Sequence, residues 1–283
     1  MTATDDRSFF NSPESIPLLK IETKLDCNSV LIIAPHLDIE TKLDRNSVLI
    51  IAPHPDDETL GCGGAIALLR KLNISVKVLV VSDGTQSHPN SIAYPSSALK
   101  ELRESESLAA LAILGVEPEA VTFLGLPDGA IPLVLHQDEM VEADGEIKER
   151  IPEDRNAIAS ICQYLSSLTP SIIFLPWRND PHPDHRASWQ LFTTACKNMN
   201  YSPRIIEYPI WDWDDKQRRD FSNSVSAWRL DISSVLELKK QAIAQYRSQI
   251  SDLIDDDPQG FRLTPEMISN FTQPWEIYLE LKS

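Results

Sequence analysis

The chain has 283 residues, enough to bury a large core in one extended α/β domain or in a domain with a C-terminal appendage. Its 42 acidic and 26 basic residues give a net charge of −16, which argues against nucleic acid or an anionic membrane surface as a partner. No apolar segment reaches the roughly 18 residues of a membrane span, and the start MTATDDRSFF lacks the features of an export signal. We therefore expect a soluble, cytoplasmic protein that binds a small molecule.

The N-terminal part contains a tandem duplication. Residues 1–20 are polar with interspersed prolines, and we expect them to form a loose arm. Residues 21–38 (IETKLDCNSVLIIAPHLD) then recur as residues 39–56 (IETKLDRNSVLIIAPHPD) with two differences. Asp57 follows the second copy, whereas Ile39 follows the first, so we interpret copy one as a non-functional echo. Its strand-like residues 30–34 can lie at the sheet edge, outside the sheet, or in the place of residues 48–52.

We assign residues 21–46 to the duplicated segment and residues 47–283 to the main domain, in which strands alternate with helices. The predicted strands are residues 48–52, 76–81, 121–124, 171–176 and 204–208, and the predicted helices are residues 65–72, 97–114, 153–168 and 186–198. A glycine turn from Gly61 and an acidic loop at 130–150 interrupt this order. The C-terminal part is predicted as segment 211–215, strand 225–230, helix 233–249 and segment 275–281. The pattern predicts an α/β fold with a Rossmann-like, mostly parallel sheet flanked by helices and a C-terminal extension.

A polar cluster follows the first strand of the main domain, in the sequence APHPDDETLGCGG. His54, Asp56 and Asp57 stand where the apolar run ends, and open α/β sheets place their ligands at the carboxyl ends of strands. An imidazole followed by carboxylates offers the nitrogen and oxygen ligands that suit Zn²⁺. This motif alone supplies only half of a metal site.

The other half follows the strand at residues 171–176, in the sequence PHPDHR. It contains His182 and His185, and two parallel strands of one sheet end at the same edge. Since a catalytic zinc ion usually has three protein ligands and one open position, we predict His54, Asp57 and His185 as the ligands. Asp56 and His182 are then free to move protons.

The two motifs together, HPDDE and HPDH after buried strands, resemble those of the PIG-L/LmbE family of zinc-dependent N-acetylglucosamine deacetylases. The resemblance covers about residues 47–208, with a further fit at residues 236–249. It implies a Rossmann-like fold and N-acetylated amino sugars or their conjugates as substrates. It also implies that His54, Asp57 and His185 hold the zinc ion and that Asp56 is the general base.

The same resemblance gives roles to the other residues of the second motif. His182 would assist either the developing oxyanion or the leaving amine, and Asp184 would orient it. Held as an imidazolium by Asp184, His182 would suit both roles.

Three further residues are candidates for substrate binding. Arg103 resembles a family arginine near the sugar site, although an ion pair with Glu106, three residues on, is an equal alternative. Asp83 and Asp128 end strands at the reactive edge and can contact sugar hydroxyls or simply form turns, since a glycine follows each. Three tryptophans can form an apolar wall for a sugar, but core packing is the more common use: Trp177, Trp211 and Trp213.

We predict a zinc-dependent hydrolase that removes the acetyl group from an N-acetylated amino sugar or its conjugate. The alternatives are an amidase that acts on a larger amide conjugate and a non-catalytic protein that binds a metal or a sugar. A nucleotide-dependent oxidoreductase is disfavoured, because the turn reads GCGG, not GxGxxG, and follows carboxylates that would repel a pyrophosphate.

Overall fold

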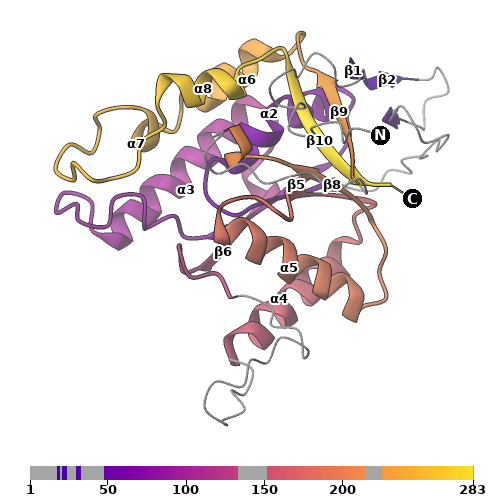
Figure 1. Ribbon diagram of the computed structural model, residues 1–283, viewed down its shortest axis with the longest axis horizontal. Helices are drawn as coiled ribbons and strands as arrows, with labels where there is room; N and C mark the ends of the chain where they lie inside the picture. Colours follow the sequence, from indigo (N-terminus) through magenta and orange to yellow (C-terminus); the bar gives the residue numbers. More distant parts are fainter. Residues whose placement is uncertain are drawn as a thin grey trace, which may run out of the picture.

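The computed structural model describes residues 18–19, 21–23, 30–32, 48–132, 152–213 and 225–282. In these ranges an eight-stranded sheet has the order β1-β9-β10-β8-β7-β4-β5-β6 (Figure 1). The strands are β1 (Leu18–Leu19), β4 (Val48–Ala52), β5 (Val76–Ser82), β6 (Val121–Leu126), β7 (Ile172–Pro176), β8 (Arg204–Tyr208), β9 (Val225–Asp231) and β10 (Trp275–Leu281). The pairs among β4 to β8 are parallel, and β10 is antiparallel to β8 and β9. The predicted fold class is therefore confirmed.

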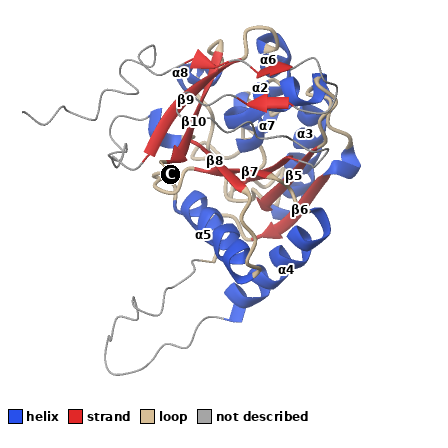
Figure 2. Cartoon of the chain, turned by 90° about the vertical axis from the view of Figure 1, so that its right-hand side faces the viewer, coloured by secondary structure: helices blue, strands red, loops and turns tan. Residues whose placement is uncertain are grey.

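Helices cover both faces of the sheet (Figure 2). One face carries α2 (Asp57–Lys71), α3 (Ser96–Ile113), α6 (Leu236–Ile243), α7 (Arg247–Ile250) and α8 (Pro265–Phe271), and the other carries α4 (Pro152–Leu168) and α5 (Pro183–Asn198). Two short 3₁₀ helices are η2 (Pro118–Ala120) and η4 (Trp211–Trp213). None of the helices in the described ranges is both long and apolar enough to cross a membrane.

Strand β4 lies at the centre because both of its faces are apolar. Val48, Ile50 and Ala52 belong to the core on the side of α2, and Leu49 and Ile51 belong to the core on the side of α4 and α5. Successive side chains of a strand point to opposite faces, so a strand covered on both sides needs a continuous apolar run. The polar motif that follows therefore lies at the edge of a fully buried strand.

Helix α2 begins eight residues earlier than predicted, and the glycines lie inside it rather than in a turn before it. A Cβ atom on Gly61 would lie 2.7 Å from Cε2 of Tyr208, and one on Gly64 would lie 2.7 Å from Cβ of Ile232. Real Cβ atoms do not approach other atoms so closely. These glycines therefore permit close packing of α2 against its neighbours, which overrides their low helix propensity.

The helix predicted at residues 233–249 is divided into α6 and α7. The break contains Tyr246, which is fully buried, and its hydroxyl contacts Glu58 and Thr59 of α2. These contacts fix Tyr246 in the core under the first turn of α2, in a backbone conformation that is not helical.

The first copy of the duplication lies outside the main sheet. Its residues form β2 (Ile21–Thr23) and β3 (Val30–Ile32), a separate antiparallel pair, while Val48–Ala52 takes the central position. Leu18–Leu19, at the end of the predicted loose arm, instead pair with β9. The rest of the arm and most of the predicted acidic loop at 130–150 lie outside the described residues, and the division into domains stays a prediction.

Candidate metal centre

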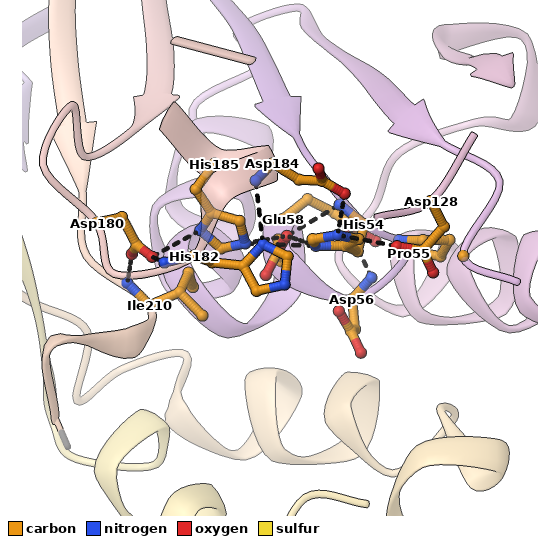
Figure 3. Close-up of polar contacts among 12 residues, drawn as sticks. His54, Pro55, Asp56, Glu58, Asp128, Asp180, His182, Asp184, His185 and Ile210 are labelled. Carbon is orange, nitrogen blue, oxygen red and sulfur yellow. Dashed lines mark hydrogen bonds and ion pairs between the residues drawn. The ribbon is translucent and has the colours of Figure 1, made fainter. Parts of the chain in front are cut away.

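The two predicted motifs meet at the carboxyl edge of the sheet, because β4 and β7 are parallel neighbours. His54 follows β4, and His185 lies in the first turn of α5, which begins after β7. Nε2 of His185 is 3.3 Å from Nδ1 of His54. Figure 3 shows these imidazoles converging, with Asp180 on one side of the cluster and Asp128 on the other. The predicted convergence of two distant loops is confirmed.

Three atoms of this cluster have the spacing of zinc ligands. Oδ2 of Asp57 lies 3.1 Å from Nδ1 of His54 and 3.2 Å from Nε2 of His185, which completes a triangle with the distance between the imidazoles. Tetrahedral zinc with bonds of about 2.0–2.2 Å places its ligand atoms about 3.3–3.6 Å apart. The three distances lie at or slightly below that range, so the predicted set of His54, Asp57 and His185 can accept a zinc ion after a small outward shift of the side chains.

Within the described residues, two further groups offer three ligand atoms within 4.8 Å of one another. The first joins His182 to His54 and His185, and the second joins Asp128 and Asp184 to His54. The three histidines form a group that can hold a metal ion, with His182 4.8 Å from His54 and 5.0 Å from His185 between ring centroids. Every group includes His54, which makes this residue the centre of the cluster.

The local backbone at the start of α2 places its polar side chains close together. Asp56 has φ 135°, in a region that side chains other than glycine rarely adopt, and such strain is typical of functional sites. The carboxylate of Asp57 accepts the N–H of His54, and that of Glu58 accepts the N–H of Asp56. Glu58 therefore supports this turn through a hydrogen bond.

Carboxylates also hold the far sides of the two imidazoles. Nε2 of His54 lies 3.2 Å from Oδ1 of Asp128 and 3.3 Å from Oδ2 of Asp184, and Nδ1 of His185 lies 3.4 Å from Oδ1 of Asp180. Metal-binding histidines usually have such a carboxylate partner, which fixes the tautomer and the ring orientation.

Asp180 is a site residue that the sequence reasoning missed. It is fully buried and accepts the N–H groups of His182, Ile210 and Trp211. In the sequence, only its position in the same loop as HPDH could have indicated a role. Its contacts with Ile210 and Trp211 depend on a later part of the chain and could not be predicted. It ties that loop to η4.

The charges around the two imidazoles favour a cation between them. Burial alone would lower the pKa of His54, but hydrogen bonds to Asp128, Asp184 and Asp57 outweigh it and hold this pKa well above its usual value. Burial would also lower the pKa of His185, but Asp57 and Asp180 raise it to about 9. Conversely, burial would raise the pKa of Asp57, yet the two imidazoles hold it well below its usual range. Carboxylates that favour protonated imidazoles equally favour a bound divalent cation.

Asp56 stands beside the ligand triangle but belongs to none of the three groups. Burial raises the pKa of its carboxyl to about 8, against the attraction of the Arg103 guanidinium, and the charges of Asp57 and Glu58 raise it further. Nη2 of Arg103 lies 3.0 Å from Oδ2 of Asp56. The carboxyl of Asp56 therefore titrates near neutrality, which suits a group that moves protons.

Arg103 is buried, so the alternative of a surface ion pair with Glu106 is wrong. Besides Asp56, its guanidinium donates to the carbonyl oxygens of Pro55 at 2.6 Å and Gly84 at 3.0 Å. Glu106 instead accepts the N–H and the hydroxyl of a residue in α7, Ser248.

The structure differs from the predicted arrangement, in which Asp184 orients the ring of His182. The Asp184 carboxylate lies against His54 and accepts the N–H of Gly129 at 2.7 Å, while its backbone N–H donates to Nδ1 of His182 at 3.2 Å. Burial lowers the pKa of His182 to about 4, and the charges of His185 and His54 lower it further. His182 is therefore a neutral imidazole and not the predicted imidazolium. Because its Nδ1 accepts a hydrogen bond, the ring proton lies on Nε2.

Of the three residues predicted to bind substrate, one forms a turn and two line a cavity. Oδ1 of Asp83 accepts the N–H and hydroxyl of Thr85 and the N–H of Asp128, which is the turn-forming alternative, and Asp83 does not line the cavity. Arg103 and Asp128 do line it, and Trp211 does as well, whereas Trp177 is buried in the core.

The cavity next to the cluster has a volume of about 270 Å³. One side is polar and is formed by His54, Asp56, Asp57, Arg103, Asp128 and His182. The opposite side is apolar and comes from the segment after β8, from the loop before α8 and from α8 itself. A small molecule in this cavity would contact the ligand cluster and the Asp56 carboxyl together.

The fold and the cluster together define an α/β protein with a group of histidines and carboxylates that can hold a metal ion at the carboxyl edge of its sheet. The family model of PIG-L, described as GlcNAc-PI de-N-acetylase, matches residues 49–196, which is more than half of the chain. The chain belongs to the PIG-L family, as its two motifs predicted.

Solved structures share this fold. N,N′-diacetylchitobiose deacetylase from Pyrococcus horikoshii is 22% identical with a TM-score of 0.55, over 82% of this chain and 83% of that chain. The 4-carboxy-2-hydroxymuconate hydratase GalB from Pseudomonas putida KT2440 is 21% identical with a TM-score of 0.51, over 72% and 80%. The zinc-inhibited form of teicoplanin deacetylase Orf2 is 19% identical with a TM-score of 0.56, over 84% and 99%. The fold thus carries deacetylases and a hydratase alike.

Proposed function

We propose that this protein is a zinc-dependent N-deacetylase that hydrolyses the acetamido group of an amino sugar or its conjugate. The observation that carries the proposal is the ligand triangle of His54, Asp57 and His185 with the carboxyl of Asp56 free beside it in the same cavity. A structural zinc site is closed by four protein ligands and needs no adjacent base. The deacetylases that share the fold support the same chemistry.

The ion contributes one part of the reaction and the side chains contribute the rest. His54, Asp57 and His185 would hold a Zn²⁺ ion, which would supply Lewis acidity toward the acetyl carbonyl and toward water. Asp56 accepts the proton of the attacking water as the new carbon–oxygen bond forms. The same carboxyl then gives that proton to the nitrogen as the carbon–nitrogen bond breaks, so that acetate and a free amine leave. A pKa of about 8 suits both transfers near neutral pH.

His182 and Arg103 serve this reaction in different ways. The Nε2–H of neutral His182 donates a hydrogen bond to the carbonyl oxygen on which negative charge develops. Arg103 keeps the carboxyl of Asp56 in place through the contact at 3.0 Å. Asp184 acts through His54, since its carboxylate holds the far side of that imidazole.

The test measures zinc content and primary-amine release from a panel of N-acetylglucosamine derivatives. We expect Asp56→Asn to retain zinc and to lose turnover by about 10²–10⁴-fold, the usual contribution of a general base. Asparagine tolerates positive φ, so this variant should fold. His185→Ala should lose zinc, and Glu237→Gln, at an exposed position of α6, is the matched control. Full activity of Asp56→Asn would refute its assignment as the base.

A further inference from the structure

The side of the cavity that faces the cluster is an apolar wall. Its surface residues are Trp211, Phe261 and Met267, and three buried apolar side chains complete its lining: Ile210, Leu263 and Phe271. Figure 3 shows the carboxylate of Asp56 pointing from the cluster toward the C-terminal helices drawn below it. The cavity therefore has a charged side and an apolar side.

The three surface residues of the wall are only partly buried, although they pack against the main core. Apolar surface that is exposed to water is less favourable in free energy than buried apolar surface by about 25 cal/mol per Å². An apolar group of a ligand that covers this wall regains that free energy, whereas a sugar hydroxyl in the same place would lose its hydrogen bonds to water. The wall therefore favours an apolar part of the ligand.

Aromatic contacts connect the wall directly to the reaction centre. The ring of Trp211 stacks on His182 with centroids 6.0 Å apart and planes at 24°, and Phe261 meets Trp211 edge-on at 5.6 Å. Since we place His182 at the carbonyl oxygen of the substrate, the wall begins one ring away from the scissile amide. An apolar group bound there is close to that amide, either in the acyl part or on the sugar.

The rest of the cavity is suited to the polar part of the same ligand. Gln86, Ser87 and Gln249 line it along with the carboxylates of the cluster, and they offer amide and hydroxyl groups for hydrogen bonds. The wall itself comes from residues 211–271, outside the part of the chain that the family model matches. It is therefore a property of this chain's C-terminal part and not of the two metal-binding motifs.

We infer that the substrate carries a compact apolar group, of the size of a phenyl ring, next to the amide, and that the wall of Trp211, Phe261 and Met267 binds it. The inference rests on the proposed deacetylase function. The volume of about 270 Å³ lies just below the usual range of about 300–1,000 Å³ for small-molecule sites, which favours a ring over a long alkyl chain.

Three substrates test the inference by their kcat/KM for primary-amine release. They are methyl N-acetylglucosaminide, benzyl N-acetylglucosaminide, and methyl glucosaminide with an N-phenylacetyl group in place of acetyl. We expect one of the two aromatic substrates to exceed the methyl glycoside at least about tenfold, the effect of burying a few methylene equivalents. A preference for the benzyl glycoside places the apolar group on the sugar, and a preference for the phenylacetyl substrate places it in the acyl part.

Variants of Met267 test the wall itself. Glutamine has nearly the shape of methionine but is polar, so Met267→Gln should reduce the aromatic preference to below about threefold, whereas the apolar Met267→Leu should retain it. Ser269→Ala, at an exposed position of α8, is the control and should behave as the wild type. A full aromatic preference in Met267→Gln would refute the assignment of the wall.

The outcomes separate this inference from the proposed function. Equal kcat/KM for all three substrates would refute the apolar site and leave the deacetylase proposal intact. Amine release from none of them would refute the deacetylase proposal. In that case the inference is tested by calorimetry, which compares the binding of benzyl glucosaminide with that of methyl glucosaminide. Tighter binding of the benzyl compound would support the apolar site, and equal or weaker binding would refute it.

Discussion

At the scale of single residues, the basicity of Asp56 depends on two opposing effects. Burial raises the pKa of its carboxyl, and the guanidinium of Arg103, which lies on α3, lowers it. Arg103 lies 47 residues away in sequence, yet its Nη2 is 3.0 Å from Oδ2 of Asp56. The packing of α3 on the loop after β4 therefore adjusts the pH range in which Asp56 can accept a proton.

Removing the charge of Arg103 should change the pH dependence of the reaction. In Arg103→Met the pKa of Asp56 rises, because the effect of burial is no longer opposed by the guanidinium. Only the ionised carboxyl accepts a proton, so activity near pH 7 should fall by roughly tenfold and recover at higher pH. The measurement is kcat/KM from about pH 6 to pH 10. Arg103→Lys keeps the charge and should keep most of the profile; an identical profile in Arg103→Met would refute this coupling.

The sequence predicted the meeting of the two motifs better than the surroundings of their side chains. His54, Asp57 and His185 are set by short spacings within two motifs, and their convergence needs only that two parallel strands be neighbours. The partners of Asp184 depend on tertiary contacts instead. Because Asp184 lies in the first turn of α5, its backbone N–H faces His182 and its carboxylate is left to contact His54 and Gly129. No local pattern contains that information.

At the scale of elements, α2 shows how tertiary packing overrides a local signal. Glycines after a strand predict a turn, but here they let α2 lie against β8 and the segment after β9. The N–H groups of Gly64 and Ala65 also donate to Glu276 of β10, which pairs with buried Lys239 of α6. This network joins α2 to the C-terminal part of the chain.

Two neighbouring glycines of α2 should respond differently to alanine. In Gly64→Ala the new Cβ would lie 2.7 Å from Cβ of Ile232, and such overpacking costs about 1–3 kcal/mol. In Gly63→Ala it would meet Cγ of Lys239 at 3.1 Å, which requires a shift of only a few tenths of an ångström, while helix propensity improves by up to about 1 kcal/mol. Thermal unfolding should show a Tm several degrees lower for Gly64→Ala and little change for Gly63→Ala. Equal Tm values would contradict the packing argument.

At the scale of the whole molecule, the parallel part of the sheet could be predicted and the C-terminal part only in outline. Alternating strands and helices predict that β4 to β8 are parallel, whereas their order also depends on the connection from β6 to β7, which returns to the other side of β4. The antiparallel position of β10 between β8 and β9 is instead fixed by contacts between distant segments, such as Arg204 with Glu280. The same distance in sequence explains why Trp211 was the only residue of the apolar wall that the sequence suggested.

The duplication allows a test of which segment the fold requires. Deleting residues 21–38 removes β2 and β3, which pair only with each other, and leaves HPDDE intact. Deleting residues 39–56 instead joins Asp38 to Asp57 and restores the motif as HLDDE, with Leu37 in the place of Pro55 and Cys27 in the place of Arg45. Both chains are equally short and contain one complete copy.

Both deletion variants should fold and bind zinc, because either copy supplies the same apolar strand for the central position. We expect the variant without residues 21–38 to keep the zinc content and kcat/KM of the full chain within about twofold. The variant without residues 39–56 should bind zinc equally but turn over more slowly. Pro55 lies next to Gly84 and its carbonyl accepts from Arg103, so leucine there disturbs the loop that carries Asp56. Loss of zinc or activity in the first variant would show that copy one supports the site, contrary to its separate place outside the main sheet.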